Sequence, residues 1–200
     1  SIRRQRQMCI RDRPCISGEM GSGAVFFSGC ALHCVFCQNE NIANGTAGKV
    51  ISTERLGEIF LELQEKGANN INLVTPGQFV PQIIKAVELA RNQNLKIPIV
   101  YNTSSYENVD TIRSLEGIVD IYLPDFKYFD TALSAKYSHA PDYPAVAKAV
   151  IAEMVRQTGA AVFENGEDSL MKRGTIVRHL ILPGCTKDSK AVLKLSLIHI

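Results

Sequence analysis

The chain has 200 residues, of which 46% are hydrophobic and 21% are charged, and its formal net charge is +2. This predicts a globular domain with a real core and argues against a basic nucleic-acid-binding surface. No apolar run approaches the roughly 18 residues of a membrane span, and the start has no apolar secretory core, so we expect a cytoplasmic protein without nucleic-acid or membrane partners.

The two ends of the chain differ in character from the rest. Residues 1–13, SIRRQRQMCIRDR, contain five arginines without apolar periodicity, and the closing LSLIHI interrupts a helix-like polar pattern. We predict an extraneous leader at residues 1–13, a core domain at residues 14–195 that is incomplete at its C-terminal side, and an extraneous tail at residues 196–200. The alternative for the leader is a basic arm that binds an acidic partner.

Between these ends, predicted strands alternate with predicted helices. The helices are indicated by apolar residues three and four apart around residues 56–63, 83–90 and 146–154, with Ser52-Thr53 and Gly67 bounding the first and Pro81 opening the second. Short β-branched and apolar runs predict buried parallel strands at residues 24–28, 70–74, 97–101, 118–123 and 175–182. Such alternation is typical of βαβ units, which form either a doubly wound open sheet or a (β/α) barrel.

Polar residues follow the predicted strands. In both architectures the chemistry lies at the carboxyl ends of the strands. The residues found there are Cys30, Cys34 and Cys37; Thr75 to Gln78; Asn102 to Ser105; Asp125 and Lys127; and, within and after the fifth run, Arg178, His179 and Cys185. Each group alone is explained by an ordinary turn or a surface ion pair and would not indicate a function. Their coincidence on one edge predicts a functional site.

Three of the six cysteines lie within residues 30–37. In a reducing compartment, cysteines clustered in this way favour metal binding or catalysis over disulfides. A structural zinc site requires four ligands, and because His33 lies between two of the cysteines and is poorly placed to be the fourth, Cys185 or His179 would have to complete it. A four-iron cluster held by three thiolates instead keeps one iron open for a further ligand. Both readings are compatible with the spacing alone.

The C-x3-C-x2-C spacing, with the aromatic Phe36 directly before the third cysteine, resembles the signature of radical S-adenosylmethionine (radical SAM) enzymes. A further resemblance is to pyruvate formate-lyase activating enzymes, in VFFSGCALHCVFCQN, VDIYLPDFKYFD and VRHLILPGCTKDS. The segments PCISGEMGSGAVFFSGC, INLVTPGQFVPQI and IPIVYNTSSYE are similar to a related set of activating-enzyme-like proteins. The resemblance covers residues 14–195 and implies an α/β fold, a partial (β/α)6 TIM-like barrel truncated at its C-terminal side.

The resemblance also implies cofactors and site residues. Cys30, Cys34 and Cys37 would hold a [4Fe-4S] cluster whose open iron binds the amino and carboxylate groups of SAM. Reductive cleavage of SAM would yield methionine and a 5′-deoxyadenosyl radical that abstracts hydrogen from a substrate. The implied SAM or substrate contacts are Phe36 near the adenine; Thr75, Pro76 and Gly77 in place of a Gly-Gly-Glu stretch; Asn102 in place of an Asp; Asp125 and Lys127 as the Asp-x-Lys motif; and Arg178.

The implied activity is that of a radical SAM oxidoreductase that activates a glycyl-radical enzyme. Its partners would be a reductant such as flavodoxin or ferredoxin and a glycyl-radical enzyme or another protein substrate. Because the Gly-Gly-Glu carboxylate is missing and Asn102 replaces an Asp, modification of a small molecule or peptide is a second hypothesis. A non-catalytic iron–sulfur electron-transfer protein is the third. We expect His179 to face the surrounding helices as a packing residue.

Overall fold

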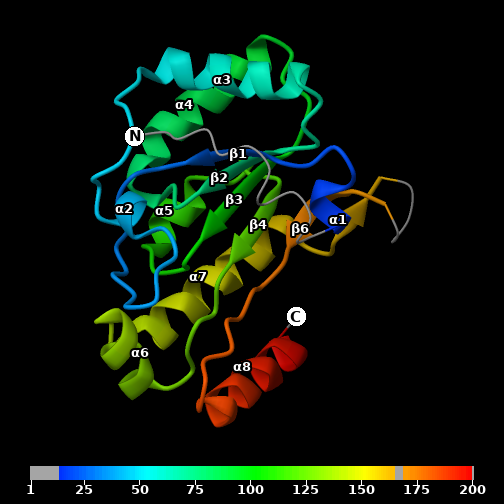
Figure 1. The fold of residues 1–200 in the computed structure, drawn as a ribbon. Helices are drawn as coiled ribbons and strands as arrows, with labels where there is room; N and C mark the ends of the chain where they lie inside the picture. Colours follow the sequence, from blue (N-terminus) through cyan, green and yellow to red (C-terminus); the bar gives the residue numbers. More distant parts are fainter. Residues whose placement is uncertain (1–13, 165–168, 200) are drawn as a thin grey trace.

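The computed structural model describes residues 14–164 and 169–199, so the predicted leader at residues 1–13 lies outside the described residues. The centre is a six-stranded sheet in the order β1-β2-β3-β4-β6-β5 (Figure 1). Its parallel strands are β1 (Gly23–Phe26), β2 (Ile71–Val74), β3 (Ile99–Thr103), β4 (Ile121–Pro124) and β6 (Met171–Thr175). The two-residue β5 (Val162–Phe163) pairs antiparallel with β6.

This strand order decides between the two architectures that the sequence allowed. The first four strands pair in chain order, whereas a doubly wound sheet reverses direction at a switch point. The sheet is not closed, because β1 and β5 are its two edges. The prediction of an α/β partial TIM-like barrel is therefore confirmed, and the carboxyl ends of the parallel strands lie along one edge.

The main core lies between one face of the sheet and four helices: α3 (Thr53–Glu65), α4 (Val80–Asn92), α5 (Val109–Arg113) and α7 (Tyr143–Thr158). On the opposite face, α1 (Pro14–Ser17) contributes Ile16 to a smaller cluster with alternate residues of β3 and β4. Side chains of a strand point alternately to its two faces, which explains this division. None of the helices in the described part of the chain is long and apolar enough to span a bilayer.

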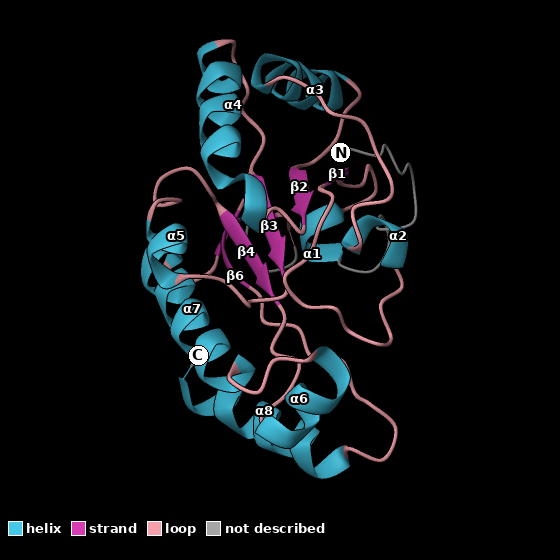
Figure 2. Cartoon of the chain, turned by 90° about the vertical axis from the view of Figure 1, so that its left-hand side faces the viewer, coloured by secondary structure: helices cyan, strands magenta, loops and turns pink. Residues whose placement is uncertain are grey.

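The remaining helices surround the carboxyl edge or extend from it. α2 (Glu40–Ala43) follows β1, and a 3₁₀ turn (Gly77–Phe79) precedes α4. α6 (Thr131–Ser138) and α8 (Thr186–His199) lie together at the end of the molecule opposite α3 and α4 (Figure 2).

The local signals for two helices are confirmed. The Ser52 side chain accepts a hydrogen bond from the Arg55 backbone N–H at 3.1 Å and caps α3. Gly67 follows the end of α3 with a φ of +80°, a left-handed conformation that glycine adopts without strain. Pro81 lies in the first turn of α4, where its missing N–H costs no helical hydrogen bond.

The predicted fifth strand at residues 175–182 is misplaced, because β6 runs over Met171–Thr175 and shares only Thr175 with the prediction. The regular strand ends at Thr175, although the following chain still pairs with β4 through Ile176 N–H to Tyr122 O (2.9 Å) and Arg178 N–H to Pro124 O (2.8 Å). Beyond this point Leu180 and Ile181 are exposed, at 49% and 65%. A strand needs a partner to pair with, and its partner β4 ends at Pro124. The apolar run in the sequence does not show where that partner ends.

Candidate active site

The loop that leaves β1 carries the three clustered cysteines. Gly29 enters it with a φ of +93°, and its N–H donates to the Ile42 carbonyl at 2.8 Å, which ties the loop to α2. Leu32 is buried against aromatic residues of the β4 end and α7. The loop is therefore anchored on both sides of the thiols.

The Cys34 thiol has a specific partner in α6. Ser138 Oγ donates to Cys34 Sγ at 2.9 Å and lies 2.7 Å from the Tyr128 hydroxyl. One residue on, the Val35 N–H donates to the Tyr137 carbonyl at 3.0 Å. These contacts fix Cys34, and with it the middle of the loop, against α6.

All three thiols are free and partly buried. Burial raises the pKa of the Cys30 thiol; the Leu32 backbone opposes this rise, and the neighbouring Cys34 and Cys37 reinforce it. Metal binding would displace the proton from such a thiol. Cys30 lines one cavity, whereas Cys34 and Cys37 line another of about 190 Å³ beside α2.

Within residues 14–164 and 169–199, no group of three His, Cys, Asp or Glu side chains already converges as a metal site. Three soft thiolate donors on one loop nevertheless form a donor set that fits an iron–sulfur cluster. The zinc alternative loses one of its proposed ligands, because both ring nitrogens of His179 have partners. They lie 2.8 Å from the Phe126 carbonyl and 2.9 Å from Ser189 Oγ.

Four of the predicted site residues form one polar network at the carboxyl ends of β3 and β4. Asp125 contacts Lys127 Nζ at 2.5 Å and Arg178 Nη2 at 2.7 Å. The same Arg178 atom donates to Asn102 Oδ1 at 2.6 Å. Two cations thus share one carboxylate, so the network carries a formal charge of +1. The buried Arg178 Nε has no hydrogen-bond partner among the described residues.

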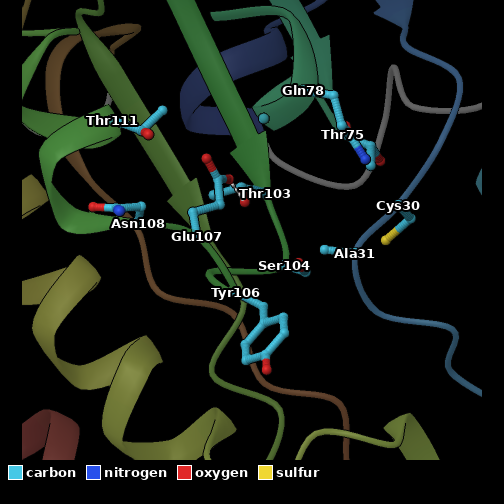
Figure 3. Close-up of a pocket in the computed structure, with 11 residues that line it drawn as sticks. Cys30, Ala31, Thr75, Gln78, Thr103, Ser104, Tyr106, Glu107, Asn108 and Thr111 are labelled. Atoms are coloured by element: carbon cyan, nitrogen blue, oxygen red, sulfur yellow. Dashed lines mark hydrogen bonds between the residues drawn. The ribbon is translucent and has the colours of Figure 1, made fainter.

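A separate cavity of about 160 Å³ lies between the cysteine loop, the end of β2 and the end of β3 (Figure 3). Of the predicted residues, it brings together Cys30, Thr75 and Gly77. Pro76 is buried beside it, at the start of the 3₁₀ turn. Phe36 does not line this cavity and packs instead against the cluster around Leu32.

Thr75 adopts a backbone conformation that is rare for its residue type. Its φ is +57°, and its N–H donates to the Asn102 carbonyl at 2.9 Å. A β-branched residue in the left-handed region carries strain of about 1–3 kcal/mol, which a glycine would avoid. The Gly-Gly-Glu stretch that the resemblance implies has a glycine at this position, where this chain has Thr75 in a left-handed conformation.

The residues of the cavity that were not singled out from the sequence are Ala31, Tyr106, Glu107, Asn108 and Thr111. Burial raises the pKa of the Glu107 carboxyl, although hydrogen bonds from Thr103 and Tyr101 oppose the rise. Glu107 lies four positions beyond the end of β3, in the loop that leads to α5, whereas the residues predicted from this strand end are Asn102 to Ser105. Reading each post-strand loop to the next helix would have included it.

Tyr143 of α7 joins the loops after β3 and β4. Its hydroxyl accepts from the Lys127 N–H at 2.9 Å and lies 2.7 Å from the Asp125 carbonyl and 2.9 Å from the Ser104 carbonyl. The residue is fully buried. A single side chain therefore sets the relative position of the charged network and the β3 loop.

We expect Tyr143→Phe to lower the free energy of unfolding by about 1–3 kcal/mol, because it leaves buried backbone groups without a partner. Urea denaturation measures this change. Tyr106→Phe is the matched control: its more exposed hydroxyl bonds Asp142 at 2.8 Å, and its loss should cost less than about 0.5 kcal/mol. Equal effects of the two substitutions would contradict the assigned role of Tyr143.

An open, mostly parallel sheet with thiols, a charged network and a cavity at its carboxyl edge defines a barrel-type α/β protein with an enzyme-like site. Residues 24–191 match the radical SAM superfamily, and the chain belongs to that superfamily. Its members typically use a [4Fe-4S] cluster and SAM, perform SAM-cleaving radical chemistry and need a reductant.

A relative in Methanocaldococcus jannaschii, described as an uncharacterized protein, is 25% identical over 169 residues. The match covers 81% of this chain and 45% of that relative, so the chain spans less than half of the relative's length.

Proposed function

We propose that residues 14–195 are the core of a cytoplasmic radical SAM enzyme that cleaves SAM reductively and uses the resulting 5′-deoxyadenosyl radical for hydrogen abstraction. The observation that carries this proposal is the three-thiol loop after β1 in a chain of the radical SAM superfamily. Cys30, Cys34 and Cys37 are the proposed cluster ligands. Reducing conditions in the cytoplasm would keep these thiols free.

A bound [4Fe-4S] cluster and SAM together supply the one-electron cleavage of the sulfonium bond. The chain's own residues would position and enclose these groups. Ser138 holds the Cys34 thiol through its hydrogen bond, and the loop after β1 is anchored by Gly29 and Leu32. The network of Asp125, Lys127 and Arg178 offers a surplus positive charge at the same edge, suited to an anionic group of SAM or substrate.

For the substrate, we propose a backbone glycine of a glycyl-radical enzyme, with flavodoxin or ferredoxin as the electron donor. The support is the resemblance of the segments around Cys30, Asp125 and Arg178 to pyruvate formate-lyase activating enzymes. A second hypothesis is modification of a small molecule or peptide. It is favoured by Thr75 to Gly77 in place of Gly-Gly-Glu and by Asn102, a neutral partner of Arg178 where the resembling enzymes have an Asp.

The test is an anaerobic assay of the full-length protein reconstituted with iron and sulfide, given SAM and a strong reductant, with and without a glycyl-radical enzyme. We expect 5′-deoxyadenosine and methionine by chromatography, and a glycyl radical signal in the mixture. Cleavage of SAM without a radical on any partner glycine would instead favour the small-molecule or peptide hypothesis. A cluster-loaded protein that forms no 5′-deoxyadenosine in either mixture would be an electron carrier, or an enzyme that cleaves SAM only when a different substrate is bound.

A further inference from the structure

Glu107 places a carboxylate in the cavity beside Cys30. It comes from the loop between β3 and α5 and lies next to Thr103, with Thr75 and Cys30 across the cavity (Figure 3). Two hydroxyl groups hold it: Tyr101 donates to Oε2 at 2.6 Å, and Thr103 donates to Oε1. Tyr101 is fully buried in the main core and Thr103 is almost so, which makes the support of this carboxylate rigid.

The charge of this carboxylate is not balanced nearby. Both of its hydrogen-bond donors are neutral, and in the described part of the chain no Lys, Arg or His forms an ion pair with it. Asp125, in contrast, contacts two cations at the same edge of the sheet. A carboxylate has about four acceptor positions, so two hydroxyl donors leave capacity for a further donor. A buried carboxylate of this kind is stabilised when a cation enters the cavity.

The backbone of Thr75–Gly77 lies directly against this carboxylate. A Cβ built on Gly77 would be 3.0 Å from the Glu107 carboxyl carbon and 3.0 Å from Oε2. Glu107 therefore reaches, from the β3 loop, the segment at the end of β2 that stands in place of Gly-Gly-Glu. The residue after Gly77 is Gln78, so this segment itself supplies no carboxylate.

We propose that Glu107 accepts a hydrogen bond from the amino group of the methionine part of SAM, and so supplies from the β3 loop the carboxylate that the β2 segment lacks. This inference rests on the proposed function, because it takes SAM as the ligand. The group that binds must be a hydrogen-bond donor, since the SAM carboxylate would be repelled, and an amino group keeps N–H donors when its nitrogen also binds a metal. Glu107 is thus a binding residue for one functional group of the cofactor.

The test is calorimetric binding to the cluster-loaded full-length protein without a reductant, so that no turnover occurs. Three ligands separate the contribution of the amino group to binding from that of the adenosine part: SAM, S-adenosylhomocysteine, which keeps the amino group, and 5′-methylthioadenosine, which lacks the amino-acid part. We expect Glu107→Gln to weaken binding of the first two by about 10- to 100-fold, the effect of one charge-assisted hydrogen bond, and to leave the third unchanged. Glu88→Gln, on the exposed side of α4, is the control and should leave all three unchanged.

A second variant keeps the charge but moves it. In Gly77→Ala, the new methyl group pushes the Glu107 carboxylate away from its position, and we expect SAM binding to weaken several-fold while 5′-methylthioadenosine binding is kept. Unchanged SAM binding in Glu107→Gln, or an equal loss for all three ligands, would overturn this inference and leave the proposed function standing. A wild-type protein that does not bind SAM at all would overturn both.

Discussion

Cys34→Ala is expected to abolish assembly of the iron–sulfur cluster. The substitution leaves two thiolates on the loop after β1, too few to hold three iron corners, and it also removes the acceptor of the Ser138 hydrogen bond. Iron and sulfide per chain after anaerobic reconstitution, together with the visible absorbance, measure the loss. We expect both contents to fall to a small fraction of the wild-type values, and 5′-deoxyadenosine formation to disappear with them.

The matched control for this prediction is Cys185→Ala. Cys185 is also a free, partly buried cysteine, but it lies directly before α8 and outside the three-thiol loop. We expect a full complement of iron and sulfide in this variant. A full complement in Cys34→Ala, or a complete loss in Cys185→Ala, would refute the assignment of the ligands.

Asp125→Asn is expected to destabilise the protein by about 3 kcal/mol. The Asp125 carboxylate contacts both Lys127 and Arg178, and the side chains of these three residues are only 15–23% exposed. Removing its charge leaves two neighbouring cations without a counter-ion in a poorly hydrated place. For a chain of this length, we expect the midpoint of thermal unfolding to fall by about 6–12 °C.

Asp110→Asn is the control, because it removes an ion pair of similar length. Asp110 contacts Arg113 at 2.6 Å, but these side chains are 79% and 61% exposed. Water screens such a pair, and its loss should cost between about 0 and 1 kcal/mol. If both substitutions shift the unfolding midpoint equally, the Asp125 network contributes no more than a surface ion pair.

Local signals in the sequence were sufficient where the chain itself contains the cause. The caps of α3, the proline at the start of α4 and the alternation of β and α elements depend on neighbouring residues, and the structure has them where they were predicted. The fifth strand was misplaced because its end depends on β4, a partner more than 50 residues away. The antiparallel β5 was missed for another reason: a strand of two residues is too short to show a periodic pattern.

The same distinction holds for the site. The spacing of Cys30, Cys34 and Cys37 is a local pattern, and it led to the superfamily to which the chain belongs. Arg178 and Asn102 are 76 residues apart, and their contact at 2.6 Å depends on the pairing of three strands. Glu107 was overlooked because nothing in its neighbourhood distinguishes it from an ordinary loop carboxylate until Gly77 and Tyr101 are placed beside it.

By itself, the sequence determined the α/β class, the three-thiol loop and the strand ends where the chemistry lies, because each follows from periodicity or spacing along the chain. Only the tertiary structure decided which polar residues share a contact. It joined Asp125, Lys127, Arg178 and Asn102 in one network and placed Glu107 against Gly77. The physical reason is that hydrogen bonds and ion pairs act over a few ångströms in space, and parallel strands bring together residues that are distant along the chain.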